Sequence, residues 1–341
     1  MNPYRSPLLI ILAVVVVAVL IAILQLDLKA PRADRNWEPE FANLTTFEDL
    51  GGGRWRLNNL RYWTWNESGA KDKIWGDRTI DENAVTALWY YVQPFGGWDG
   101  IAHTFVVFEL AGKDGEAADY IGVSVEARRE IGEVYSSLSG LFRAYELTYL
   151  WASEKDLLTR RAVYLPDELY GYRLNVPPET ARAALRHFIA RTNDLAARPR
   201  FYNTLSSNCT NELAKTVNGG GEDIIPYHYS FVLTGFADRY LHRLGYLGEP
   251  DRDFAAIQRA GHLNAIVRAN AGASEKAFSK AVRAGLEAAA IPGRQASADQ
   301  AISRRIFPES PACEAGSRAC RSSTGRCAAA VCLTSATDEN G

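Results

Sequence analysis

Charge of one sign, cysteine and late aromatic residues are all scarce in this chain of 341 residues. The formal net charge is only −2, so the composition argues against nucleic acid as a partner. All eight tryptophans lie between Trp37 and Trp151, and Phe307 is the one aromatic residue from Gly293 onward. The chain is therefore not uniform. We expect a compact domain at residues 51–292 and a disordered tail at 293–341.

Cysteine is absent from the body of the chain apart from Cys209. The other four cysteines stand in the tail, with no histidine near them and with spacings that fit no zinc site: Cys313, Cys320, Cys327 and Cys332. We therefore expect no metal and no cofactor. If the tail cysteines pair with each other in an oxidising compartment, Cys209 remains as the odd free thiol.

Charge is also absent from residues 8–26 (LLIILAVVVVAVLIAILQL). This run is long enough to span a bilayer core, and it is longer than the apolar region of a cleavable signal peptide. We expect a single-pass anchor in the bacterial inner membrane, with a cytoplasmic stub at 1–7, a tether at 27–50 and the domain in the periplasm. A cleaved signal peptide is the alternative.

The body predicts an α+β fold in which helices pack on an antiparallel sheet. Short alternating or apolar segments that follow each other closely are typical of antiparallel strands. We expect strands at 54–65, 84–92, 101–110, 120–126, 145–152, 161–164 and 170–176. We expect helices at 178–197, from Cys209 onward, and within 231–244 and 255–290.

Cys209 follows a polar, turn-prone run from Thr204 to Asn208, and helix-forming residues come directly after it. A cysteine at a helix N-terminus meets unpaired N–H groups and the positive end of the helix dipole, which favour a thiolate. The alternative is an inert, half-buried residue near a helix cap. A catalytic role requires a base elsewhere in the chain.

His103 is the best candidate for that base. It opens an apolar strand directly after a glycine-rich loop, where a strand end can border a cleft. His228, in a Pro-Tyr-His-Tyr segment, is the reserve candidate. Taken alone, a histidine at a strand start is more often structural.

Glu126 stands opposite His103 if the hairpin turns at Asp114 and Gly115, because paired residue numbers then add up to 229. A carboxylate there would orient the imidazole and stabilise its charged form. A register slip of one residue would break this pair and leave Ser124, Arg128 or Glu130 as partners. The alternative is that Glu126 belongs to a solvated charge cluster at 126–130.

Several motifs in this chain occur in the order found in one family. They are NLRYW at 59–63, HTF at 103–105, SVEARREIGE at 124–133, GLFRAYEL at 140–147, YNTLSSNCT at 202–210 and AFSK at 277–280. Over residues 37–290 the chain resembles the Lnb N-terminal periplasmic domain family. The resemblance implies a circularly permuted papain-type fold, related to the permuted NlpC/P60 group, in which histidine precedes cysteine.

The resemblance also implies Cys209 as nucleophile and His103 as base, acting on a membrane lipid or lipoprotein by acyl transfer. Glu126 as the third member rests mainly on the hairpin pairing. We expect the Cys209 N–H, with Asn208 or Tyr202, to bind the oxyanion. A cell-envelope peptidase and a non-enzymatic binding domain are the two alternatives, and the sequence predicts no oligomeric state.

Overall fold

The computed structural model describes residues 12–14, 16–17, 29–112, 115–165, 167–220 and 224–290. Most of the predicted span at 8–26 and all of the predicted tail at 293–341 lie outside these ranges. Residues 12–14 and 16–17 are helical. Within the described ranges, no helix combines the length and the apolar character that a membrane crossing requires.

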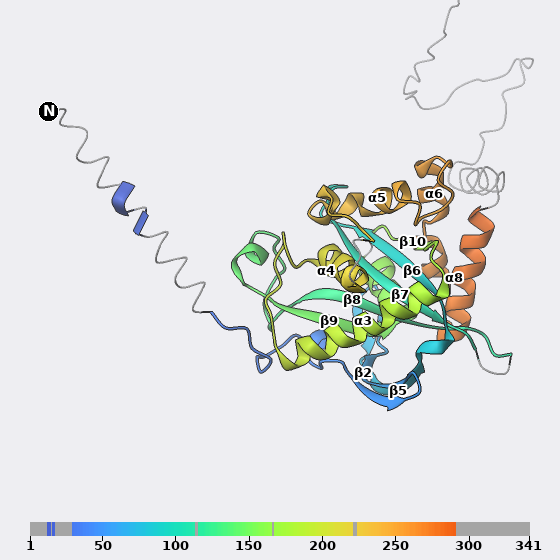
Figure 1. Cartoon of the computed structure of the whole chain (residues 1–341), viewed down its shortest axis with the longest axis horizontal. Helices are drawn as coiled ribbons and strands as arrows, with labels where there is room; N and C mark the ends of the chain where they lie inside the picture. Colours follow the sequence, from blue (N-terminus) through green and yellow to red (C-terminus); the bar gives the residue numbers. More distant parts are fainter. Residues whose placement is uncertain are drawn as a thin grey trace, which may run out of the picture. The chain divides into compact units, whose positions relative to one another are not determined.

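A large mixed sheet forms the centre of the domain (Figure 1). Its strand order is β1-β2-β9-β8-β7-β6-β10, and β5 pairs with β2 beside this path. Neighbouring strands are antiparallel except β2 and β9, which meet in parallel at Arg61 and Ala152. The strands of this sheet are β1 (Thr46–Gly51), β2 (Arg54–Arg61), β5 (Trp75–Asp81), β6 (Val85–Pro94), β7 (Ala102–Leu110), β8 (Asp119–Arg128), β9 (Glu146–Ser153) and β10 (Tyr170–Arg173). A separate pair is formed by β3 (Thr64–Asn66) and β4 (Gly69–Asp72).

Helices cover both faces of the sheet, because its central strands are apolar on both sides. In β7, Val106 and Phe108 belong to one core, whereas Phe105 and Val107 belong to the other. The first core includes side chains of α3 (Pro178–Ala197), α4 (Cys209–Val217), α5 (Ala237–Arg243) and α6 (Phe254–Ala260). The second includes side chains of α2 (Glu154–Thr159), the π-helical η4 (Arg160–Tyr164), α7 (Asn264–Asn270) and α8 (Glu275–Ala290).

Short 3-10 turns connect these elements: η1 (Pro39–Phe41), η2 (Glu82–Ala84), η3 (Ser139–Phe142), η5 (Asn218–Gly220), η6 (Tyr229–Phe231) and η7 (Thr234–Phe236). The mixed α+β class predicted from the sequence is confirmed, and α3 has the predicted bounds. The strand predicted at 161–164 is wrong, because this segment continues α2 as the π-helical η4. Ser153 caps α2 by accepting a hydrogen bond from the Asp156 N–H, and the chain stays helical beyond Thr159.

Residues 27–50 do not form the predicted tether throughout. Trp37, Phe41 and Phe47 are buried, and β1 pairs with β2 from Thr46 onward. The segment has the charge and proline content of a linker, but its aromatic side chains are spaced so that each reaches the domain. Burial of a side chain of this size stabilises the domain by roughly 2 kcal/mol. The folded domain therefore begins well before residue 51.

Asp156 of α2 links its helix to residues 61–65, at the end of β2 and the start of β3. Its carboxylate accepts hydrogen bonds from Arg61 Nε and Nη2 at 2.8 Å each, from the Trp63 N–H at 2.9 Å and from Trp65 Nε1 at 2.8 Å. Asp156 and Arg61 are both fully buried. Four donors from β2, β3 and the residues between them thus bind one carboxylate of α2. The helix α2 continues directly into η4.

Replacing Asp156 with alanine is expected to lower the free energy of unfolding by about 3 kcal/mol, because Arg61 would remain buried without its main counter-charge. Chemical denaturation followed by circular dichroism measures this change. Glu48→Ala is the control, since Glu48 pairs with Arg56 at the surface and both side chains are more than half exposed. Equal midpoints for the two variants would show that the Asp156 network does not stabilise the domain.

Candidate functional site

The first residue of α4 is Cys209, and Asn208 is its N-cap. The Asn208 Oδ1 accepts a hydrogen bond from the Asn211 N–H at 2.8 Å, which satisfies one of the free donors at the helix start. The Asn208 Nδ2 donates to the carbonyls of Thr204 and Phe231 at 2.8 and 2.7 Å. The capping residue therefore fixes the turn that presents the thiol, and both of its amide hydrogens are committed to carbonyl groups.

The hairpin of β7 and β8 has the register predicted from the sequence. Phe105 pairs with Ser124 and Val106 with Val123, so the paired numbers add up to 229. His103 and Glu126 continue this register and lie on the same face, with 3.3 Å between His103 Nε2 and Glu126 Oε1. The predicted juxtaposition of imidazole and carboxylate is present at the end of the sheet.

Ser124 lies between these two groups. Its Oγ is 2.6 Å from His103 Nε2, and it donates a hydrogen bond of 2.7 Å to Glu126 Oε1. The Ser124 hydroxyl has one proton and donates it to Glu126. In the contact with His103, the Nε2–H group therefore donates and the Ser124 Oγ accepts. This fixes the tautomer of neutral His103 and leaves Nδ1 as the nitrogen that takes up a proton.

Arg161 completes the arrangement from η4. Its Nη2 donates to Glu126 Oε1 at 2.9 Å and to Ser124 Oγ at 3.0 Å, while Nη1 donates to the Leu157 carbonyl at 3.0 Å. The guanidinium lies 4.4 Å above the Phe105 ring, and that ring stacks on the imidazole of His103. Sequence reasoning missed Arg161, because segment 161–164 was assigned to a strand. The Ser153-x-x-Asp156 cap was the local signal for a helix there.

Charge pairing sets the protonation of the site. Burial lowers the pKa of His103, but the Glu126 carboxylate and the Cys209 thiolate outweigh it and raise that pKa to about 9. Burial raises the pKa of Cys209, but the His103 charge, a hydrogen bond from His103 and contacts with Thr104 lower it below the usual value. Burial also raises the pKa of Glu126, but His103 and Arg161 hold it well below the usual carboxyl range. Near neutral pH these directions favour a thiolate and imidazolium pair.

Cys209, His103 and Glu126 open into one cleft of about 610 Å³. The cleft is lined by aromatic and aliphatic side chains together with charged ones, among them Arg129, Glu133 and Asp167. Tyr202 also lines it, and its hydroxyl lies 3.2 Å from that of Tyr135, so this hydroxyl pair is held beside the thiol. Volume and lining suit an organic substrate of moderate size.

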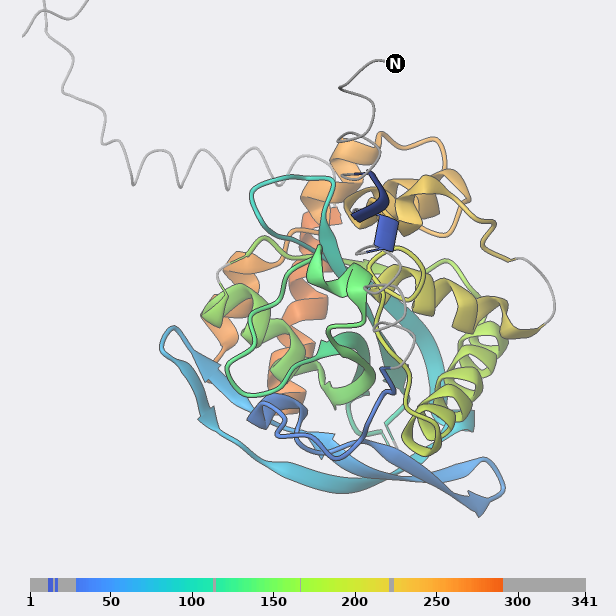
Figure 2. The ribbon, with the colours of Figure 1, turned by 90° about the vertical axis from the view of Figure 1, so that its left-hand side faces the viewer.

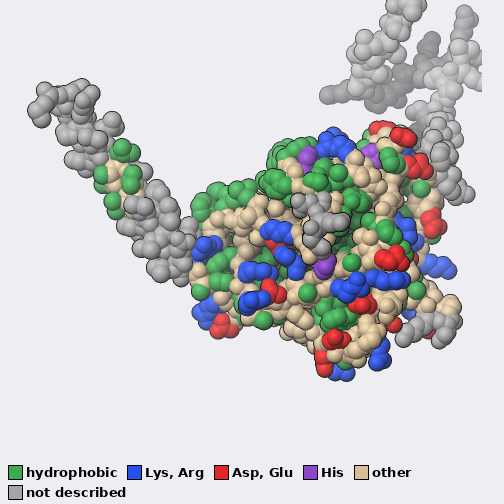
Figure 3. Space-filling view, viewed as in Figure 1, with side chains coloured by type: hydrophobic (Ala, Val, Ile, Leu, Met, Phe, Trp, Pro, Cys, Tyr) green, Lys and Arg blue, Asp and Glu red, His purple; other side chains and the backbone are tan. Residues whose placement is uncertain are grey.

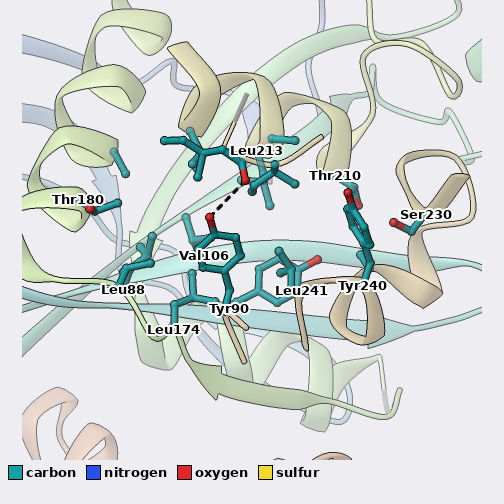
Figure 4. Close-up of a pocket in the computed structure, with 18 of the residues that line it drawn as sticks. Leu88, Tyr90, Val106, Leu174, Thr180, Thr210, Leu213, Ser230, Tyr240 and Leu241 are labelled. Atoms are coloured by element: carbon teal, nitrogen blue, oxygen red, sulfur yellow. Dashed lines mark hydrogen bonds between the residues drawn. The ribbon is translucent and has the colours of Figure 1, made fainter. Parts of the chain in front are cut away.

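A second cavity lies on the apolar side of α4 (Figure 4). Leu88, Val106, Leu213 and Leu241 are among the side chains around it, together with the buried side chain of Tyr90. Its volume is about 70 Å³, and Cys209 is not part of its lining. This space corresponds to a few methylene groups, so it is a packing defect beside the helix and the larger cleft is the candidate active site.

The remaining candidates from the sequence lie elsewhere. His228 stacks on Tyr240 and contacts Arg243, whose charge together with burial lowers the pKa of His228. Arg128 donates to the carbonyls of Phe41 and Ala42, and Glu130 pairs with Arg35. Across the described part of the chain, no group of three or more acidic, histidine or cysteine side chains is placed to bind a metal ion.

Glu126→Gln is expected to lower the pKa of His103 and to raise that of Cys209, because the carboxylate charge that holds the proton on His103 is lost. Alkylation of Cys209 by iodoacetamide at pH 7 should slow about tenfold, the effect of one pKa unit, and its rise with pH should move toward the ordinary thiol range. Mass spectrometry of the Cys209 peptide measures the rate without interference from the tail cysteines. Glu38→Gln is the matched control, since Glu38 lines the same cleft but pairs with Arg129. An unchanged rate in Glu126→Gln would refute the electrostatic account.

Comparison with known proteins identifies a family that part of the chain resembles. Residues 71–227 match the family model of the Lnb N-terminal periplasmic domain, and this range contains His103, Ser124, Glu126, Arg161 and Cys209. No curated protein and no solved structure matches the chain. The family predicted from the motifs is confirmed and assigns the domain to the periplasm. Residues 71–227 therefore resemble an Lnb N-terminal periplasmic domain.

Proposed function

We propose that this protein is a membrane-anchored periplasmic thiol enzyme, an acyltransferase or hydrolase that acts through a thioester on Cys209. The observation that carries the proposal is the partly buried His103–Ser124–Glu126–Arg161 arrangement beside a helix-start cysteine in an open cleft. Such a set supplies a nucleophile, a base and a group that orients the base. The substrate we propose is a lipid or lipoprotein acyl group.

In the proposed first step, His103 holds the proton of the Cys209 thiol, and the thiolate attacks an ester or amide carbonyl carbon. A carbon–sulfur bond forms, and the carbonyl electron pair moves to oxygen. The Cys209 N–H has no partner within its own helix, and together with the Tyr202 or Tyr135 hydroxyl it stabilises the oxyanion. Asn208 contributes by holding the turn, since its amide hydrogens are already used.

In the second step, the oxyanion collapses and the bond to the alcohol or amine leaving group breaks. His103 gives its proton to that leaving group, which leaves a thioester on Cys209. An amine or water then passes a proton to His103 and attacks the thioester, and the thiolate is released. Because Ser124 and Arg161 hold Glu126 and the Nε2 side of the ring, the same nitrogen of His103 serves both transfers.

The proposed architecture is a permuted papain-like fold. In support of it, α4 packs on the antiparallel strands β7 and β8, and His103 precedes Cys209 in the sequence. We also propose that residues 8–26 anchor the protein in the inner membrane as a single span. The support for the anchor is the uncharged sequence of this run.

A cell-envelope peptidase of the permuted NlpC/P60 type is the second candidate. The observation that favours it is the mixed lining of the cleft, where Arg129, Glu133 and Asp167 accompany the aromatic side chains. These charged groups suit a polar peptide better than an acyl chain. The thiol chemistry is the same in both candidates, so the identity of the covalent adduct separates them.

Incubation of the purified full chain with envelope phospholipids is expected to add one acyl group to Cys209, seen as a mass increase of the Cys209 peptide. Cys209→Ser removes the thiol and should give no adduct that hydroxylamine releases. His103→Ala should abolish the adduct, because the ion pair is lost. Modification that depends on Cys209 with a peptide but never with a lipid would support the peptidase, and no adduct with either would remove both enzymatic proposals.

A further inference from the structure

Large apolar side chains are exposed around the mouth of the cleft. Trp98 and Val134 line the cleft itself, yet Trp98 is 52% and Val134 is 84% exposed. Leu138, Phe142 and Leu205 are also more than half exposed. Exposed aromatic and aliphatic side chains that are grouped together mark a surface for a partner or a membrane.

These side chains come from uncharged segments of three loops, and Asp99, Glu133, Arg143 and Arg200 directly flank these segments. Residues 95–98 (FGGW), 134–142 (VYSSLSGLF) and 201–208 (FYNTLSSN) contain no Asp, Glu, Lys or Arg. Thr204 ties the third loop to the second, since its N–H donates to the Gly140 carbonyl at 3.3 Å and its Oγ1 to the Ser137 carbonyl at 2.7 Å. The first loop meets the second where the Phe95 and Tyr135 rings contact each other. We call the three loops the rim.

The N-terminal segment leaves the domain beside the rim. Lys29 Nζ donates to the Arg143 carbonyl at 2.9 Å, directly after Phe142, and the Arg32 N–H donates to Glu146 Oε1 at 3.2 Å. The apolar run of the sequence ends at Leu26, three residues before Lys29. An extended residue spans at most about 3.5 Å, so a bilayer that holds this run lies within about 10 Å of the backbone of Lys29, whose side chain reaches the rim.

The figures agree with this placement. Figure 2 looks onto the end of the domain that lies on the left in Figure 1, and the segment around 131–145 crosses this end. Figure 3 shows hydrophobic side chains gathered over the loop that carries η3. Lys29 and Arg32 thus lie at the same end of the domain as the rim.

We propose that the rim docks into the headgroup region of the bilayer leaflet that anchors the chain, so that the mouth of the cleft faces the membrane. Trp, Tyr, Phe and Leu with Ser and Gly suit this zone, where apolar groups are buried while hydroxyls and backbone groups stay hydrated. The proposal rests on the membrane anchor of the proposed function and not on the chemistry of Cys209. It implies that a lipid carbonyl at the headgroup boundary reaches the thiol without leaving the leaflet.

Quenching of tryptophan fluorescence by brominated lipid tests this orientation. The full chain is reconstituted into vesicles of phosphatidylglycerol and phosphatidylcholine, with the phosphatidylcholine brominated near the headgroup end of its chains. Trp98 is the exposed tryptophan of the described residues. Trp98→Phe is expected to remove most of the quenching, and Phe142→Trp or Leu138→Trp in that background should restore it.

Ile74→Trp in the same background is the matched control. Ile74 is as exposed as the rim residues, but it precedes Trp75, which pairs with Arg61. Arg61 in turn meets Ala152, at the end of β9 opposite to the cleft. A tryptophan at 74 should stay unquenched. Quenching at 74 equal to that at 142 or 138, or no quenching at any rim position, would overturn the proposal. Circular dichroism of each variant checks that it is folded.

Mass spectrometry of the Cys209 peptide for an acyl adduct, on protein from the same vesicles, separates the two proposals. Rim quenching without any acyl adduct would support the docking surface and remove the proposed acyl transfer from lipid. An acyl adduct without rim quenching would do the reverse.

Discussion

One partly buried carboxylate, that of Glu126, sets the charge of the whole site. A carboxylate inside a protein persists only when cationic or hydrogen-bonding groups replace the lost water. Here His103, Ser124 and Arg161 all contact Glu126 Oε1. With the thiolate of Cys209 and the two cations, the cluster holds two negative and two positive charges and is neutral overall. Loss of any one member leaves a buried charge without compensation, so the protonation of the thiol depends on side chains from β7, β8, η4 and α4 together.

The sequence was sufficient for those parts of the site that depend on local geometry. The alternation of the strands and the turn expected between them predicted the register of β7 and β8, and with it the contact between His103 and Glu126. The polar run before Cys209 likewise indicated a helix start, since a capping side chain and the helix after it are encoded within a few residues. The family could also be predicted, because its motifs lie in order along the chain.

The other parts depend on contacts between distant segments. Arg161 reaches Glu126 only because α2 packs on the sheet and continues as η4. The local sequence Arg-Arg-Ala-Val-Tyr is as typical of a strand as of a helix, so it does not predict this contact. Trp37 and Phe41 lie in a charged, proline-containing segment, and their burial depends on a surface that other elements supply. The sequence suggested the side-chain amide of Asn208 as a donor to the oxyanion. In the fold, this amide donates to the carbonyls of Thr204 and Phe231 instead.

The position of the cleft follows from the two-sided core. Cys209 belongs to the helical layer on one face of the sheet, whereas His103, Ser124 and Glu126 share the face of Phe105 and Gly122, on which α2 and η4 pack. Groups from opposite faces can meet only where the sheet ends, and there the connecting loops necessarily surround the thiol. The rim segments of these loops expose apolar side chains, and Lys29 lies beside them through its hydrogen bond to the Arg143 carbonyl. The geometry that allows the catalytic groups to meet therefore also puts the mouth of the site at the end of the domain nearest to the proposed anchor.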